Sequence, residues 1–91
     1  MWNIFFTSSA KKAYFSLPKK IQAIADLLIG DLKISGPVRG NWKNYGKLMY
    51  NEHHCHLKSG RPTYVMCWRV IDNNNKIIEV YYAGTHEKAP Y

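Results

Sequence analysis

The first third of the chain has apolar positions at helical spacing, preceded by a short run typical of a strand. Residues 2–7 are rich in aromatic and β-branched side chains and predict an opening strand. Apolar residues then recur every three or four positions, which predicts one helix over about 9–17 and a second over about 18–34. Ser8 and Ser9 are candidates to cap the first helix. The pair Gly36-Pro37 is expected to end the second.

The remainder of the chain predicts a loop followed by three strands. Glycine, proline and asparagine are frequent over residues 36–47, which favours a loop. Strands are expected over Leu48–Leu57, Thr63–Ile71 and Lys76–Ala83, with turns at Lys58–Pro62 and Asp72–Asn75. The order of strand, two-helix hairpin and antiparallel β-meander predicts an α+β fold with the sheet packed on the helices. A chain of 91 residues is expected to form a single domain over residues 1–91.

Alternation along the predicted strands separates the two faces of the sheet. One apolar face of the strand over Thr63–Ile71 holds Tyr64, Met66, Trp68 and Val70, and it is expected to cover the helices or part of the core. On the preceding strand, His54, His56 and Lys58 share one face. We therefore expect one face of the sheet to belong to the core and the other to carry the function.

The charge of the chain narrows its possible partners. The 13 lysines and arginines outnumber the 6 acidic residues, giving a formal net charge of +7. Such a balance favours a polyanionic partner, meaning nucleic acid, an acidic membrane or an acidic protein, although it is also compatible with a merely cationic surface. Cys55 and Cys67 suggest free thiols in a reducing compartment rather than a disulfide framework. With no signal peptide or membrane span recognisable, we expect a cytoplasmic protein and no membrane partner.

The order of elements and several short motifs resemble the RelE/ParE superfamily of toxins from type II toxin–antitoxin systems. The resemblance covers nearly the whole chain and includes the helix junction Leu17-Pro18-Lys19-Lys20 and the tail Gly84-Thr85-His86, with Tyr91 beyond it. The tail is most similar to the HigB-type and YoeB-type branches, in which a histidine near the end serves catalysis. The resemblance implies a RelE-like fold and a ribosome-dependent mRNA endonuclease, which uses the RNA 2′-hydroxyl as nucleophile. It implies no cofactor, and an acidic antitoxin that binds the toxin in a hetero-oligomer.

The resemblance also assigns candidate site residues. His54 and His56 stand where RelE-like enzymes present two lysines, His86 stands at the arginine or histidine of the tail, and Tyr91 lies near the tyrosine that stacks on or orients the base. The arginine usually found early in the third strand is missing from Tyr64-Val65-Met66. Arg61 or Arg69 could supply this charge.

Cleavage of RNA through its own 2′-hydroxyl requires a proton acceptor, a proton donor and positive charge around the phosphate. Histidine can fill either proton role because its pKa of ~6.5 leaves both forms populated near neutral pH. We expect His54 or His56 to act as base or phosphate contact and His86 as general acid. Phosphate contacts are expected from the flanking cations Lys47, Lys58, Arg61 and Arg69.

Other interpretations of the same residues remain open. His54 and His56 could lie on a solvated strand face, and His86 could cap backbone groups. The three imidazoles also resemble a zinc site, but an acidic or thiolate ligand is lacking on that face, so no metal is expected. For the whole protein, the alternatives are a non-enzymatic toxin resembling the ParE branch, which binds and poisons DNA gyrase, and an inactive member that only binds partners.

Overall fold

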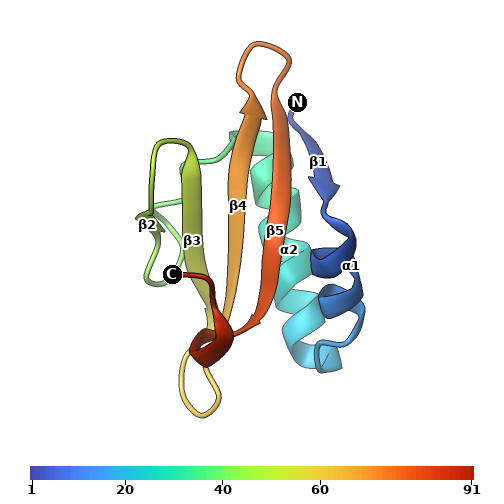
Figure 1. Cartoon of the computed structure of the whole chain (residues 1–91), viewed down its shortest axis with the longest axis vertical. Coiled ribbons are helices and arrows are strands. Elements are labelled where there is room, and N and C mark those ends of the chain that lie inside the picture. The colour runs from blue at the N-terminus through green and yellow to red at the C-terminus, as the bar shows by residue number, and fades with distance from the viewer.

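The computed structural model describes residues 1–91 and consists of a sheet with two helices on one face (Figure 1). In chain order the elements are β1 (Asn3–Phe6), α1 (Ser8–Phe15), α2 (Lys19–Ser35), β2 (Gly46–Lys47), β3 (Glu52–Lys58), β4 (Tyr64–Asp72), β5 (Ile77–Thr85) and the 3-10 helix η1 (His86–Lys88). The sheet has five strands in the order β1-β5-β4-β3-β2. β1 runs parallel to β5, and the other neighbours are antiparallel. The predicted α+β fold, with its helical hairpin and meander, is confirmed.

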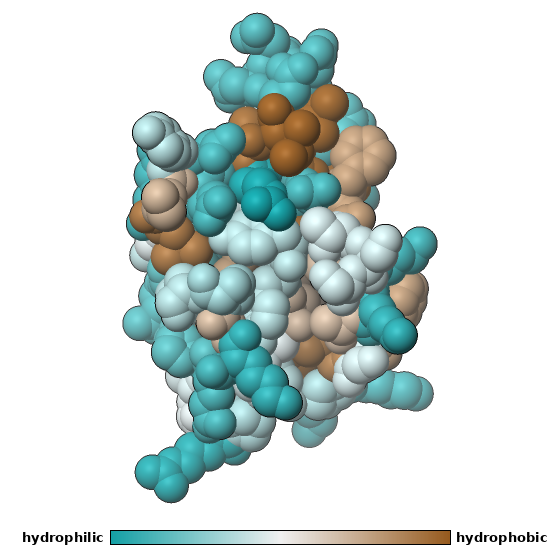
Figure 2. Space-filling model, viewed as in Figure 1, coloured by the Kyte–Doolittle hydropathy of each residue, from teal (hydrophilic) through white to brown (hydrophobic).

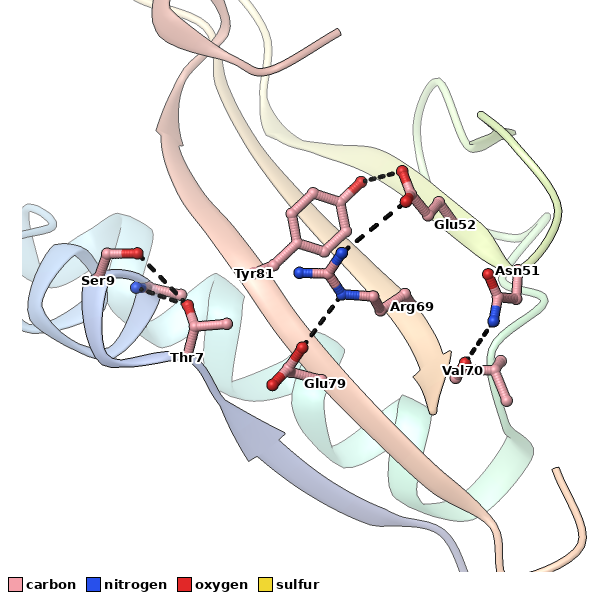
Figure 3. Close-up of polar contacts among 9 residues, drawn as sticks. Thr7, Ser9, Asn51, Glu52, Arg69, Val70, Glu79 and Tyr81 are labelled. Atoms are coloured by element: carbon pink, nitrogen blue, oxygen red, sulfur yellow. Dashed lines mark hydrogen bonds and ion pairs between the residues drawn. The ribbon is translucent and has the colours of Figure 1, made fainter. Parts of the chain in front are cut away.

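The helix ends differ in part from the prediction. Thr7 caps α1, since its backbone is extended and its Oγ1 accepts a hydrogen bond from the backbone N–H of Ala10 at 3.1 Å (Figure 3). Capping by Ser8 or Ser9 is wrong, because both serines already lie within the helix. α2 ends at Gly36 as predicted, and Gly36 has a φ of +87°. Neither helix is long and apolar enough to cross a membrane.

The strand predicted over Leu48–Leu57 begins only at Glu52, and the short strand β2 lies at the end of the segment predicted as a loop. β2 and β3 are separated by a turn in which Tyr50 has a positive φ of 34°. The loop before β2 is fixed to the body by Trp42, whose Nε1 donates to the Asp31 carboxylate at 2.8 Å. This arrangement brings the short strand β2 alongside β3 as an edge of the sheet.

The main core lies between the sheet and the helices. α2 contributes Ile21, Ala25, Leu28 and Leu32, all of them buried. The fully buried Trp68 of β4 packs in the same cluster, and its Nε1 donates to the carbonyl of Pro37 at 3.0 Å. The predicted core face of β4 is therefore confirmed.

Residues on the other face of β4 are buried as well. Val65 and Cys67 have 0% exposure, yet they are not part of the cluster beneath the helices. The helices cannot cover this second face, because they lie on the opposite side of the sheet (Figure 1). Side chains of β3 and β5 and the C-terminal segment must therefore exclude water from it.

The two neighbouring leucines of α2 provide a test of this core. Leu28 is 0% exposed and Leu27 is 69% exposed. We expect Leu28→Ala to lower the free energy of unfolding by about 2–5 kcal/mol, because it removes buried methyl groups and leaves a cavity. Leu27→Ala should change it by less than about 0.5 kcal/mol. Urea denaturation of both variants measures the difference, and equal effects would contradict the described packing.

Candidate functional site

The face of the sheet turned away from the helices, here called the open face, carries the predicted histidines. His54 pairs with Cys67, and Cys67 pairs with Tyr82, across β3, β4 and β5. His56 pairs with Val65 in the same way. Directly opposed residues of antiparallel strands point to the same face, so the histidines stand beside the buried Val65 and Cys67.

The C-terminal segment returns over this face. β5 extends to Thr85, two residues beyond the predicted end, and η1 then turns the chain back across the sheet (Figure 1). The backbone N–H of His86 donates to the carbonyl of Thr63 at 2.8 Å, which ties the start of η1 to the chain just before β4. The tail therefore reaches the strands that carry the histidines.

Four aromatic and imidazole rings meet where the tail crosses the sheet. The ring centroids of His54 and Tyr91 are 4.4 Å apart, and those of His56 and His86 are 5.6 Å apart. His86 and Tyr91 lie 5.7 Å apart with nearly perpendicular rings. The structure thus brings all four predicted catalytic residues together, while their roles remain predictions. No group of three or more His, Cys, Asp or Glu side chains is arranged to hold a metal ion.

Burial favours the neutral form of both strand histidines. Desolvation is the main cause that lowers the pKa of His54, followed by the charges of His56 and His86. Desolvation likewise lowers the pKa of His56, with further contributions from the charges of His86 and Lys43. The Nδ1 atoms of His54 and His56 are buried and have no hydrogen-bond partner. Neutral imidazoles of this kind can accept a proton near pH 7.

His54 is the more enclosed of the two. A Cβ at position 46 would lie 2.8 Å from His54 Nε2, so the imidazole rests against the backbone of Gly46, and Tyr91 packs on it as well. His56 instead faces His86, which is exposed. The pair His56 and His86 is therefore the better placed for proton transfer to and from a ligand.

Tyr91 serves as a phenol at neutral pH. Burial, followed by the nearby thiols of Cys67 and Cys55, raises its pKa to about 12. It can therefore donate a hydrogen bond or stack on a base, but it cannot act as a base itself.

Lys43 is a cation at the site that sequence reasoning missed. Its carbonyl accepts the backbone N–H of His56 at 2.7 Å, and its charge contributes to the lowered pKa of that histidine. Lys43 belongs to the loop before β2, where no periodicity relates a residue to the sheet. A loop cation beside a strand histidine has no local signal in the sequence.

Among the predicted phosphate contacts, Arg61 shares a cavity with the tail histidine. Arg61 and His86 line the same polar cavity of ≈ 530 Å³, together with Thr63 just before β4, Thr85 at the end of β5, and the acidic Glu87. The cavity has no hydrophobic residue in its lining. An anion bound there would lie beside both the guanidinium and the imidazole.

Lys47 and Lys58 are not brought to the histidines. Lys47 pairs with His53, whose ring stacks on the core residue Trp68, so Lys47 points to the helix side of the sheet. The prediction that Lys58 shares the face of His56 is wrong, because a register shift follows His56. Lys58 pairs with the core-packed Tyr64 and lines a cavity with the start of α2.

Arg69 lies on the open face but is engaged by acidic partners (Figure 3). Its Nε donates to Glu79 at 3.1 Å, and its Nη1 lies 3.8 Å from a carboxylate oxygen of Glu52. Its guanidinium also stacks over the ring of Tyr81 at 4.3 Å. These contacts join β3, β4 and β5 and compensate the charge of Arg69.

The surface of the open face is mainly hydrophilic or of intermediate hydropathy (Figure 2). The largest group of strongly apolar atoms in this view lies near the turn between β4 and β5, away from the tail. The ring cluster therefore opens onto a surface suited to a polar ligand rather than an apolar one.

Comparison with known proteins identifies the fold. Neither a protein-family model nor a curated protein sequence matches the chain. A free E. coli toxin RelE variant matches with a TM-score of 0.74 over 97% of this chain and 86% of that chain, at 17% sequence identity. The YoeB dimer from Staphylococcus aureus matches with a TM-score of 0.72 over 93% of this chain and 97% of that chain, at 19% identity.

A third similar structure is a complex. A chain of the heterotetrameric YoeB-YefM toxin-antitoxin complex from Staphylococcus aureus matches with a TM-score of 0.70, at 18% identity, over 94% of this chain and 98% of that chain. The present chain therefore has the RelE-like fold predicted from its sequence.

The proximity of the imidazoles predicts their titration behaviour. We expect His54 and His56 to titrate below the ordinary histidine pKa of ~6.5, because burial disfavours the charged form. His86→Ala should raise both pKa values, since it removes a neighbouring positive charge. A histidine-resolved NMR titration of the two proteins measures this. A strand histidine that titrates above ~6.5, or that does not respond to His86→Ala, would contradict the geometry.

Proposed function

We propose that this protein is the toxin of a type II toxin–antitoxin system and acts as a ribosome-dependent mRNA endonuclease. The observation that carries the proposal is the cluster of His54, His56, His86 and Tyr91 on the open face of a RelE-like fold. Binding to a target protein, as in the gyrase-poison alternative, requires no such group of titratable side chains. The fold alone does not separate these functions, so the site decides between them.

The proposed reaction assigns one proton role to each member of the exposed imidazole pair. Neutral His56 takes the proton from the RNA 2′-hydroxyl, whose oxygen then attacks the adjacent phosphorus. The bond from phosphorus to the 5′-oxygen breaks as protonated His86 gives its proton to that oxygen. The products are a 2′,3′-cyclic phosphate and a free 5′-hydroxyl.

The flanking groups support this reaction by charge and by stacking. Arg61 and Lys43 contribute positive charge where the phosphate becomes more negative in the transition state. Tyr91 offers an aromatic face on which an unstacked base can stack, since its side chain is about half exposed and is held in place by packing against His54. His54 packs against this ring, and burial lowers the pKa of its imidazole and so favours the neutral form.

The proposed protein partner is an acidic cognate antitoxin. A net charge of +7 favours association with an acidic chain. The similar YoeB chain is described in a toxin–antitoxin complex with YefM. The ribosome and its mRNA are the proposed targets, and both are polyanions as well.

Induced expression in cells with mapping of mRNA ends tests the proposal. The wild-type protein should stop translation and produce cuts in phase with the ribosome. His86→Ala and His56→Ala should each reduce cutting by about 10²-fold or more, because each removes one proton-transfer group. Lys47→Gln is the matched control, because its side chain lies on the opposite face of the sheet.

Two results would overturn the proposed activity. Intact mRNA with DNA damage and filamentation would identify a gyrase poison. Cleavage that persists undiminished in both histidine variants would remove the imidazoles from the reaction.

The two basic residues Arg61 and Lys47 give a second test, on binding alone. Arg61 lies beside His86, whereas Lys47 faces the helix side. Arg61→Gln should weaken binding to a single-stranded RNA oligonucleotide and reduce the slope of log K against log salt by about 0.7, the effect of one lost phosphate contact. Lys47→Gln should leave the slope nearly unchanged. Fluorescence anisotropy over a range of salt concentrations measures both slopes, and the reverse order would place the RNA on the other face.

A further inference from the structure

We propose that Tyr82 is a positioning residue for His86 and acts through a hydrogen bond to the peptide that precedes His86. The Tyr82 hydroxyl donates to the carbonyl oxygen of Thr85 at 2.6 Å. The catalytic consequence rests on the proposed function, because His86 is the general acid of that reaction. The positioning itself is a property of the free protein.

One planar unit connects Tyr82 to the catalytic histidine. The carbonyl of Thr85 and the N–H of His86 belong to the same peptide group, which is rigid. Tyr82 holds the carbonyl end, and the carbonyl of Thr63 holds the N–H end at 2.8 Å. With both ends fixed, this peptide sets the direction in which the chain and the His86 side chain leave β5.

Gly84 leaves the space that the phenol needs. A Cβ at this position would lie 2.9 Å from the Tyr82 hydroxyl oxygen and 3.2 Å from Cζ of the same ring. Gly84 does not have a positive φ, unlike Gly36 and Gly60, so its backbone conformation does not require glycine. The close approach of Tyr82 is therefore the reason that a larger residue does not fit here.

Few other hydrogen bonds hold the tail in place. η1 has no side-chain cap at its N-terminus, and its three residues are exposed. Ala89 N–H donates to the His86 carbonyl at 3.1 Å, and beyond this turn Tyr91 returns to His54. A change at the peptide between Thr85 and His86 would therefore move both His86 and the base of the segment that carries Tyr91.

The Tyr82 hydroxyl stays protonated and can therefore donate this hydrogen bond. Burial is the main cause that raises the pKa of Tyr82 above its ordinary value, so the hydroxyl keeps its proton at neutral pH. Tyr82 pairs with Cys67 on the open face, whereas the ion pair of Arg69 with Glu79 lies further along the same two strands.

The decisive variant is Tyr82→Phe, which removes the hydroxyl and keeps the ring. Tyr81→Phe is the matched control, because it removes a neighbouring phenol that donates to Glu52 at 3.1 Å rather than to the Thr85–His86 peptide. On programmed ribosomes, Tyr82→Phe should lower the maximal rate of mRNA cleavage about tenfold with little change in the half-saturating concentration, as expected for a displaced proton donor. Tyr81→Phe should keep the wild-type rate.

A measurement on the free protein separates positioning from activity. In Tyr82→Phe, the amide of His86 should exchange with solvent at least several-fold faster, and its imidazole resonances should shift, while those of His53 stay unchanged. Gly84→Ala should produce the same changes, because it displaces the phenol. Unchanged exchange and resonances for His86 in both variants would overturn the positioning role.

The two proposals fail in different ways. If the wild-type protein does not cut mRNA, the proposed function fails and the exchange experiment still decides the role of Tyr82. If Tyr82→Phe loosens His86 but cleaves at the wild-type rate, the proposed link between this hydrogen bond and catalysis is wrong.

Discussion

The structure depends on one constraint, the burial of β4 on both of its faces. Val65, Met66, Cys67 and Trp68 are consecutive and all have 0% exposure. Helices cover only the face of Met66 and Trp68, because a helical hairpin can pack on one side of a sheet. Water must be excluded from Val65 and Cys67 by the neighbouring strands and the returning tail. The residues of the proposed site therefore also cover a second, smaller core.

This double role explains why imidazoles suit the position. A side chain that covers Val65 and Cys67 loses water, and a buried charge without a partner is costly. A lysine there would have to remain charged or be forced neutral far from its ordinary pKa, whereas histidine becomes neutral with a small shift. Burial thus lowers the pKa of His54 and His56 and favours the neutral imidazole, which is the form able to accept a proton. The same desolvation that completes the core favours the base form.

Periodicity predicted the helices, the meander and the core face of β4, because these features follow from local side-chain spacing. Alternation along the strand also predicted that His54 and His56 share one face, and in the structure both lie beside rings of the tail, Tyr91 and His86. Parity failed at Lys58, since a register shift has no signature in the alternation of side chains. Pairing of β1 with β5, the approach of Lys43 to His56 and the acidic partners of Arg69 are long-range contacts. Only the folded chain reveals them.

The positive charge on the open face is unevenly distributed, because acidic partners neutralise Arg69. Glu52 and Glu79 balance the guanidinium at the end of the sheet far from the tail. At the tail end, Arg61 is without an acidic partner within salt-bridge distance, and Lys43 adds its charge beside His56. A phosphate approaching this face is therefore attracted more strongly toward the imidazole pair than toward Arg69. The third-strand arginine that the resemblance led us to expect is absent, and we propose that the loop cations Arg61 and Lys43 supply its charge.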